Sequence, residues 1–293
     1  MTVSSTRRRV LRDVLRKYLT QALVYLVVTA LSILFMLPFL FALSSSLKTA
    51  TEIHAFPPKW IPQNPQWDNY IEVFRQVPFA RFILNSLVIV VLAGIGQLAS
   101  ATAVAYGFAR FRFPGRDFLF VLVLSTMILP WVVTIIPTFI LFKYLGWLNS
   151  FKPLIVPAYF GGGPFFIFLL RQFFMTIPLD LDEAAIIDGA SRLRILVNII
   201  LPLSTPALAT VAIFSVLGSW NDFFGPLIFI DDEEKFTVAL GLRLFQRTAS
   251  AGGKPVDQLL MAASMITTLP IVVLFFVMQR YFVQGIVMSG LKG

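Results

Sequence analysis

Six long apolar stretches dominate this sequence of 293 residues. Each is long enough to cross the hydrocarbon core of a bilayer, which takes roughly 20 residues of α-helix. The composition agrees, because 57% of the residues are hydrophobic and only 13% are charged, against about 25% charged in soluble domains. We therefore predict an all-α polytopic membrane protein with six transmembrane helices, over Leu19–Ser45, Ile83–Gly107, Phe118–Phe142, Pro153–Phe174, Thr205–Ile230 and Leu259–Val283.

Positive charges set the expected orientation. A cluster of Lys and Arg precedes the first stretch, at Arg7, Arg8, Arg9, Arg12, Arg16 and Lys17. Cytoplasmic flanks carry such an excess, so residues 1–18 are predicted to be a basic cytoplasmic segment and residues 19–293 a transmembrane domain. Six crossings then place both termini in the cytoplasm. The first stretch exceeds the ~7 to 15 residues of a signal-peptide core, which favours a retained anchor. Whether residues 1–18 form a helix lying on lipid or a frayed tail stays open.

Composition also excludes several kinds of site. The chain has no Cys and one His, His54, so we expect neither a thiolate nor a His cluster for a metal ion, and no cofactor. The net charge of +9 could suggest nucleic acid, but the basic residues are scattered between apolar stretches as membrane topology requires. We expect contact with membrane lipid and no binding of nucleic acid.

The second stretch is rich in Gly, Ala and Ser between residues 93 and 107. Small side chains let a neighbouring helix approach closely, so this face predicts a tightly packed partner, in the same chain or another. Prolines interrupt all the stretches but the second, which fits kinked helices around a gated path, although proline is common in membrane helices anyway; these are Pro38, Pro130, Pro137, Pro164, Pro226 and Pro270.

Within the fifth stretch, Trp220, Asn221 and Asp222 form a polar interruption. A carboxylate inside a membrane segment is costly and normally faces the bundle interior or a wet cavity. These three residues are candidates for the substrate path, since polar groups beside an aromatic face can bind a sugar. The alternative is an Asp near the outer end of the helix that serves packing only.

The segment between the fourth and fifth stretches, about residues 174–204, predicts a helix, a turn and a second helix. Asp180 and Glu183 have the spacing of a capping box, which places a helix start at Asp180. Gly189 is expected to end this helix in the left-handed conformation. Ser191 then caps a second helix that runs to Leu201, before Pro202.

Such a hairpin would present a compact knob to a partner. Ala184 and Ala185 would let its backbone seat deeply in a groove, while Glu183 and Asp188 offer charge to basic residues at the rim. With Gly189 these residues form the predicted docking site. An ordinary cytoplasmic connector is the alternative.

At this segment the chain resembles the membrane subunit of an ATP-binding-cassette importer, a binding-protein-dependent permease. The signature of that family is EAA, three residues, Gly, nine residues, Ile, one residue and Leu-Pro, matched here by Glu183, Ala184, Ala185, Gly189, Ile199, Leu201 and Pro202. The likeness is greatest to the carbohydrate-uptake branch, in the G subunit type of the maltose transporter. Supporting stretches are residues 46–48, 57–62, 105–110, 220–223, 279–281 and 290–293.

The resemblance implies a place in a heteromeric complex of the cell inner membrane. It implies that Glu183, Ala184, Ala185 and Gly189 belong to a coupling helix that docks on one of two ABC ATPase subunits. It also implies a second homologous permease, an extracytoplasmic substrate-binding protein and a carbohydrate substrate. The chain has no GxxxxGK[ST] phosphate loop, so ATP hydrolysis is expected in the partner and this subunit is not expected to be an enzyme.

Two other functions compete with the permease interpretation. The first is a proton-coupled secondary carrier in which Asp222 takes up the proton. The second is a scaffold without a pore. The last outer loop, residues 231–258, is expected to be exposed, either meeting a partner or serving as a solvated connector.

Overall fold

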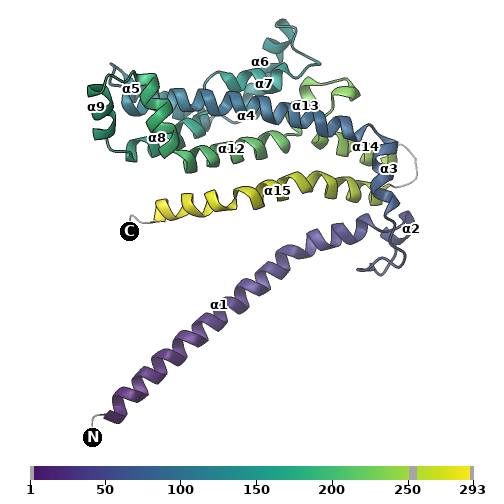
Figure 1. Cartoon of the computed structure of the whole chain (residues 1–293). Helices are drawn as coiled ribbons and strands as arrows, with labels where there is room; N and C mark the ends of the chain where they lie inside the picture. The colour runs from purple at the N-terminus through teal and green to yellow at the C-terminus, as the bar shows by residue number, and fades with distance from the viewer. Residues whose placement is uncertain (1–2, 251–255, 291–293) are drawn as a thin grey trace. The chain divides into compact units, whose positions relative to one another are not determined.

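The computed structural model describes residues 3–250 and 256–290. Within these ranges the secondary structure is helical and contains no strand. Three helices are long: α1 (Val3–Ser46), α4 (Phe79–Arg110) and α15 (Asp257–Gly290) (Figure 1). The others, in chain order, are α2 (Ala50–Ile53), α3 (Asp68–Gln76), α5 (Arg116–Ser125), η1 (Thr126–Ile128), α6 (Trp131–Tyr144), α7 (Lys152–Ile155), η2 (Val156–Tyr159), α8 (Pro164–Thr176), α9 (Asp180–Ile187), α10 (Arg192–Ile195), η3 (Leu196–Ile200), α11 (Leu201–Leu203), α12 (Thr205–Trp220), α13 (Phe224–Phe229), η4 (Glu233–Lys235) and α14 (Val238–Ser250).

Four of the predicted spans are helical segments long and apolar enough to cross a bilayer in one piece. Their apolar side chains are widely exposed, as with Tyr25 at 71% and Phe35 at 76% on α1, which is the expected surface of a helix solvated by lipid. The four segments are Arg16–Ser46, Phe79–Arg110, Lys152–Thr176 and Asp257–Gln279.

The third predicted span is a bent pair of helices, and a second bent pair joins Arg192–Leu203 to α12, which forms only the first part of the fifth predicted span; the chain has up to six crossings if each pair counts as one. Arg116–Ile128 and α6 meet at 98°. Leu129 precedes Pro130 and is extended, with ψ of 115°, because the proline ring disfavours the helical conformation of the residue before it. The segment Arg192–Leu203 and α12 meet at 82°.

Contacts divide the chain into two units, of which the first holds residues 3–72 and 256–265. After α1, its backbone is fixed by hydrogen bonds from two polar side chains, Asn69 and Lys48. The side-chain amide of Asn69 donates to the carbonyls of Ser46 and Lys48 at 2.8 and 2.9 Å. Lys48 is only 2% exposed, and its ammonium donates to the carbonyl of Lys59 at 2.6 Å. His54 lies 3.1 Å from the carboxylate of Asp257.

The second unit, residues 73–250 with 266–290, is built around α4. Helices α8 and α12 pack along it (Figure 1), so the small-residue face predicted for the second span finds its neighbours within this chain. The Ser100 hydroxyl donates to the carbonyl of Ala158 at 2.8 Å, and the Gln97 amide donates to the carbonyl of Gly162 at 3.0 Å. The core between these helices comprises Ala101, Ala105, Tyr106, Phe108, Phe120, Ile167, Leu170, Phe174, Ile177, Ile195, Ile200, Ala207 and Val211.

Within the predicted last outer loop, residues 238–246 form part of a helix that packs within the second unit and not a solvated connector. Helix α14 begins at Val238, which is fully buried and whose amide donates to the Ser86 hydroxyl of α4 at 2.8 Å. The buried ring of Phe245 meets that of Phe79 edge-on, with 6.3 Å between ring centroids. Helix α14 is amphipathic, and its apolar face packs on α4. This amphipathic pattern was not recognised in the sequence.

The close approach to α4 predicts a specific sensitivity at Gly96. A methyl group there would lie 2.4 Å from a ring carbon of Tyr159, so Gly96→Ala should cost about 1–3 kcal/mol through overpacking. Gly107, in the same helix, has no atom within 4 Å of such a methyl group, and Gly107→Ala is the matched control. Thermal unfolding in detergent should show a lower midpoint for Gly96→Ala only; equal midpoints would contradict this packing.

Candidate functional site

Helix α9 begins at Asp180, as predicted, but not through a capping box. Its N-cap residue is Leu179, and no side chain caps it. The backbone amides of Asp182 and Glu183 both donate to the carbonyl of Leu179, at 2.9 and 3.0 Å. Asp180 therefore already lies inside the helix, and the capping box was wrong. The acidic residues of this first turn, Asp180, Asp182 and Glu183, instead complement the positive end of the helix dipole.

Gly189 ends α9 in the predicted conformation. Its φ is +79°, which favours glycine because it has no Cβ. Its amide donates to the carbonyl of Ile186 at 2.9 Å, and the amide of Ala190 donates to the carbonyl of Ala185 at 2.8 Å. This pair of bonds is a Schellman motif. The hydroxyl of Ser191 then accepts from the amide of Arg194 at 3.3 Å and caps α10, also as predicted.

The second arm of the hairpin does not stop before Pro202. A π-helical turn, η3, occupies residues 196–200, and the chain continues through α11 to Leu203. A proline inside an α-helix loses one hydrogen bond and clashes with the carbonyl four residues earlier, whereas a π turn changes that spacing locally. The predicted end at Leu201 was therefore wrong, and the bend falls after α11, where the amide of Ser204 donates to the carbonyl of Ile200 at 3.0 Å.

The hairpin presents most of the predicted docking residues to solvent. Glu183, Ala184, Asp188 and Gly189 are exposed, while Ala185 is half-buried against the core of the second unit. Exposed apolar side chains accompany them, notably Ile187 at 85% and Leu193 at 69%. An apolar surface beside acidic residues is typical of a protein contact rather than of a solvated connector.

A buried ion pair, which was not predicted from the sequence, joins α9 to the end of α4. Arg110 Nε lies 3.4 Å from Asp182 Oδ2, with the two side chains 2% and 5% exposed. Arg110 Nη2 also donates to the carbonyl of Ile177 at 2.9 Å. Asp182 Oδ1 finds no hydrogen-bond partner within the part of the chain that the structure describes. No sequence spacing links these residues, which are far apart along the chain.

The same end of α4 also contacts the second arm. The Tyr106 hydroxyl donates to the carbonyl of Arg192 at 3.2 Å, and the Arg192 guanidinium lies 5.9 Å from the centroid of the Phe111 ring. Together these contacts fix both arms of the hairpin to one helix. A cavity of about 550 Å³ lies between them, lined by Arg110, Phe111, Arg112, Leu179, Asp182, Glu183, Ile186 and Arg192.

The three candidates of the fifth span have separate environments. Trp220 is 3% exposed, and its indole N–H donates to the carbonyl of Thr267 on α15 at 3.2 Å, which favours a packing role over a free stacking face. The amide of Asn221 donates to the carbonyl of Leu217 at 2.9 Å. Asp222 follows the end of α12, and its Oδ1 accepts from the amide of Gly225 at 3.0 Å.

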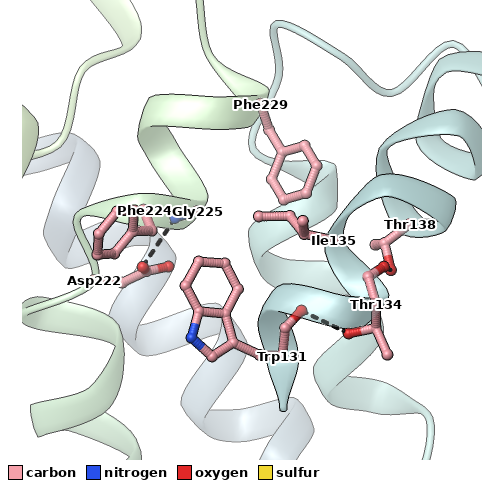
Figure 2. A pocket seen from close by; sticks show the side chains of 8 residues that line it. All are labelled: Trp131, Thr134, Ile135, Thr138, Asp222, Phe224, Gly225 and Phe229. Carbon is pink, nitrogen blue, oxygen red and sulfur yellow. Dashed lines mark hydrogen bonds between the residues drawn. The ribbon is translucent and has the colours of Figure 1, made fainter. Parts of the chain in front are cut away.

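Asp222 lines a cavity of about 460 Å³ between α6 and α13 (Figure 2). The rings of Trp131 and Phe224 form part of its wall, 5.4 Å apart between centroids and inclined by 47°. Thr134 and Thr138 lie along α6. Trp131 is not among the site residues predicted from the sequence, because only the fold brings α6 to the break after α12. Neither Trp220 nor Asn221 lines this cavity.

Two acidic residues of the segment 231–234 form ion pairs within the chain. Asp232 lies 3.0 Å from the ammonium of Lys235, and Glu234 lies 2.9 Å from the guanidinium of Arg81. The hydrogen bond from Lys235, together with the amide of Glu234, holds the pKa of Asp232 below its ordinary value. Over residues 3–250 and 256–290, no three His, Asp or Glu side chains gather into a group that could hold a metal ion.

A family model for the inner membrane component of binding-protein-dependent transport systems matches residues 98–288. The chain belongs to this family. The matched range includes the hairpin of α9 to α11 and the cavity between α6 and α13. The chain is therefore a multi-pass membrane subunit of a transport system, as its sequence predicted.

Relatives and a solved structure agree with this family. The permease chain is 34% identical over 228 residues to the trehalose/maltose transport system permease protein MalG of Thermococcus litoralis, with 77% of this chain and 81% of the relative covered. It is 32% identical over 282 residues to the galactooligosaccharides transport system permease protein GanQ of Bacillus subtilis, covering 95% and 98%. A bacterial ABC transporter involved in the import of the acidic polysaccharide alginate contains a chain of the same fold, with a TM-score of 0.79, 22% identity and coverage of 90% and 97%. None of these findings favours a proton-coupled carrier.

The buried ion pair predicts that loss of the Asp182 carboxylate destabilises the hairpin more than loss of the exposed Asp180 carboxylate. Removing one partner of a buried ion pair leaves an uncompensated charge and typically costs about 3–5 kcal/mol. Asp182→Ala and Arg110→Ala should each make the hairpin more sensitive to limited proteolysis and lower the thermal midpoint, and the double variant should be less affected than the sum of the two.

The matched control is Asp180→Ala, in the first turn of the same helix but exposed, where the loss should be only about 0.3–1 kcal/mol. If the Asp182 and Asp180 variants behaved alike, the ion pair would not hold the hairpin.

Proposed function

We propose that this chain forms half of the translocation pathway of an ATP-driven carbohydrate importer and couples to a cytoplasmic ATPase through the α9 hairpin. The observation that carries the proposal is the hairpin itself, an exposed acidic and apolar knob fixed to α4 by the buried pair of Arg110 and Asp182. A knob that moves with a membrane helix can transmit a push from a docked protein. Glu183 and Asp188 supply the charge for basic residues of the ATPase, and Ala184, Ala185 and Gly189 keep the contact close.

The topology of the chain supports a cytoplasmic position for this knob. The basic residues before the first span favour a cytoplasmic N-terminus, and α9 follows the fourth crossing, so an even number of crossings separates the two. The C-terminus, after six crossings, lies on the same side. The loops after the first, third and fifth crossings then face outward, where a substrate-binding protein delivers its cargo.

The complete importer needs further subunits. One permease of six crossings lines half a pathway, so a second homologous permease supplies the other half. Each permease docks on one ATPase subunit, which makes two, and the binding protein is extracytoplasmic. Closure of the ATPase pair would rock the two helical bundles against each other as rigid bodies. ATP hydrolysis belongs to the ATPase subunits.

Carbohydrate is the substrate class that fits best. The two related permeases reported above are named for the transport of trehalose/maltose and of galactooligosaccharides. Asn221 and Asp222, at the break after α12, are the polar groups that we place near the substrate path. Trp220 completes the predicted set by packing behind them against α15.

Two substitutions test the docking role. Glu183→Lys reverses the charge that faces the ATPase, and Gly189→Pro cannot adopt the observed φ of +79°, because proline holds φ near −65°. Both should abolish uptake and reduce co-purification of the ATPase, while the permease still inserts into the membrane at normal levels.

Asp117→Lys provides the matched charge reversal, at an exposed residue of α5 paired with Arg116. It should leave ATPase association intact. Full uptake in Glu183→Lys, or equal loss in Asp117→Lys, would overturn the docking role. Substrate-stimulated ATP hydrolysis by the reconstituted complex would separate an importer from a scaffold without a pore.

A further inference from the structure

The cavity between α6 and α13 has the properties of a wet site rather than of a lipid-facing groove. Asp222 contributes a carboxylate to it, and carboxylates within membrane segments face the bundle interior or water, because exposure to hydrocarbon is costly. The position of that carboxylate is fixed, since Oδ1 accepts from the amide of Gly225 at 3.0 Å. Figure 2 shows Asp222 held beside the backbone of α13 and across the cavity from α6.

The aromatic wall of the cavity suits one face of a sugar ring. Trp131 is 51% exposed and Phe224 is 54% exposed, so their rings are available rather than buried in the core. Inclined by 47° with centroids 5.4 Å apart, they form an open corner. The C–H face of a pyranose or furanose ring is apolar and packs on such surfaces, while few polar groups orient it. The cavity volume, about 460 Å³, is in the range of small-molecule sites.

Apart from the indole N–H of Trp131, which is a donor, the polar side chains of the cavity accept hydrogen bonds or already donate elsewhere. The hydroxyls of Thr134 and Thr138 donate to the carbonyls of Trp131 and Thr134, at 2.9 and 2.7 Å, which leaves their lone pairs as acceptors. The Asp222 carboxylate accepts as well. A ligand rich in hydroxyl donors fits this arrangement, and hydrogen bonds to the carboxylate would be strengthened by its charge.

The charge of the cavity selects among sugars. Of its eight lining residues, one is Asp and none is Lys or Arg. A uronate or a sugar phosphate entering it would bring a second negative charge beside Asp222 without a cation to compensate for either. We therefore propose that this cavity is a subsite of the permease for a neutral sugar residue, held by Trp131, Phe224 and Asp222, and that it discriminates against acidic sugars. This inference rests on the proposed function and specifies its substrate class.

Direct binding to the assembled complex tests the subsite apart from the binding protein. The permease pair with its ATPase subunits, in nanodiscs and without nucleotide, is mixed with maltose, galactobiose or arabinobiose as neutral probes and with diguluronate as the acidic probe. Saturation-transfer NMR should detect a neutral probe and not diguluronate.

Two variants of the cavity test its residues. Trp131→Ala should abolish the signal of the neutral probe. Asp222→Asn should weaken binding of the neutral probe about tenfold or more, as for loss of a hydrogen bond to a charged group, and should raise binding of diguluronate relative to the neutral probe.

Two controls match these changes outside the cavity. Trp67→Ala removes an indole that is 69% exposed, and Asp117→Asn removes a carboxylate whose side chain is 76% exposed; both should bind as the unaltered complex does. Co-purification with the ATPase and basal ATP hydrolysis confirm that each variant is assembled. Absence of binding by every neutral probe, equal binding of diguluronate, or unchanged binding in both cavity variants would overturn the subsite.

The two proposals fail in different ways. If the unaltered complex performs ATP-driven uptake with its binding protein while the cavity variants bind and import normally, the importer stands and the subsite is wrong. If the chain does not assemble with an ATPase or supports no ATP-driven uptake, the proposed function itself is wrong.

Discussion

Arg110 and Asp182 form an ion pair that is almost fully shielded from water, and the placement of the α9 hairpin depends on it. Removing two charges from water costs several kcal/mol for each ion, so a buried pair contributes little net stability compared with apolar packing. Separating the partners is strongly destabilising, because each charge would then remain buried and unpaired. Arg110 also donates a hydrogen bond to the carbonyl of Ile177, which connects the end of α8 to the ion pair. The hairpin is therefore expected to move with α4 as one body.

Breaks in the membrane helices occur where the chain supplies partners for the freed backbone groups. Hydrocarbon offers no hydrogen bonds, so unwound backbone must be satisfied by protein or water. At the break after α12, the amide of Gly225 donates to the Asp222 carboxylate at the start of α13. This hydrogen bond explains why a carboxylate is tolerated at the break: Asp222 accepts from the freed backbone amide of Gly225 and also lines the cavity as an acceptor.

Local features of the sequence predicted the local features of the site. The six apolar stretches follow from length and composition, and the turn at Gly189 and the cap at Ser191 depend only on residues within one helical turn. The capping box failed because Leu179 continues the helical conformation backward, which no residue spacing reveals. The end at Pro202 failed because a π turn accommodates that proline. Pairings between distant segments, Arg110 with Asp182 and Trp131 with Asp222, required the fold, since both are set by which helices pack together.

Helix α12 connects the two functional regions. It begins immediately after the hairpin, at Thr205, and ends at Trp220, two residues before the carboxylate of the cavity. Its 16 residues span about 24 Å at 1.5 Å per residue, and it packs along α4, which the buried pair ties to α9. A displacement of the docked hairpin therefore reaches the cavity through two packed helices rather than through loops. Asp222 follows the end of α12, whereas Trp131 lies on α6, so a displacement of α12 is expected to change the position of Asp222 relative to Trp131. In the proposed importer, a sugar residue held between Asp222 and Trp131 would therefore be bound or released as the docked ATPase moves the hairpin.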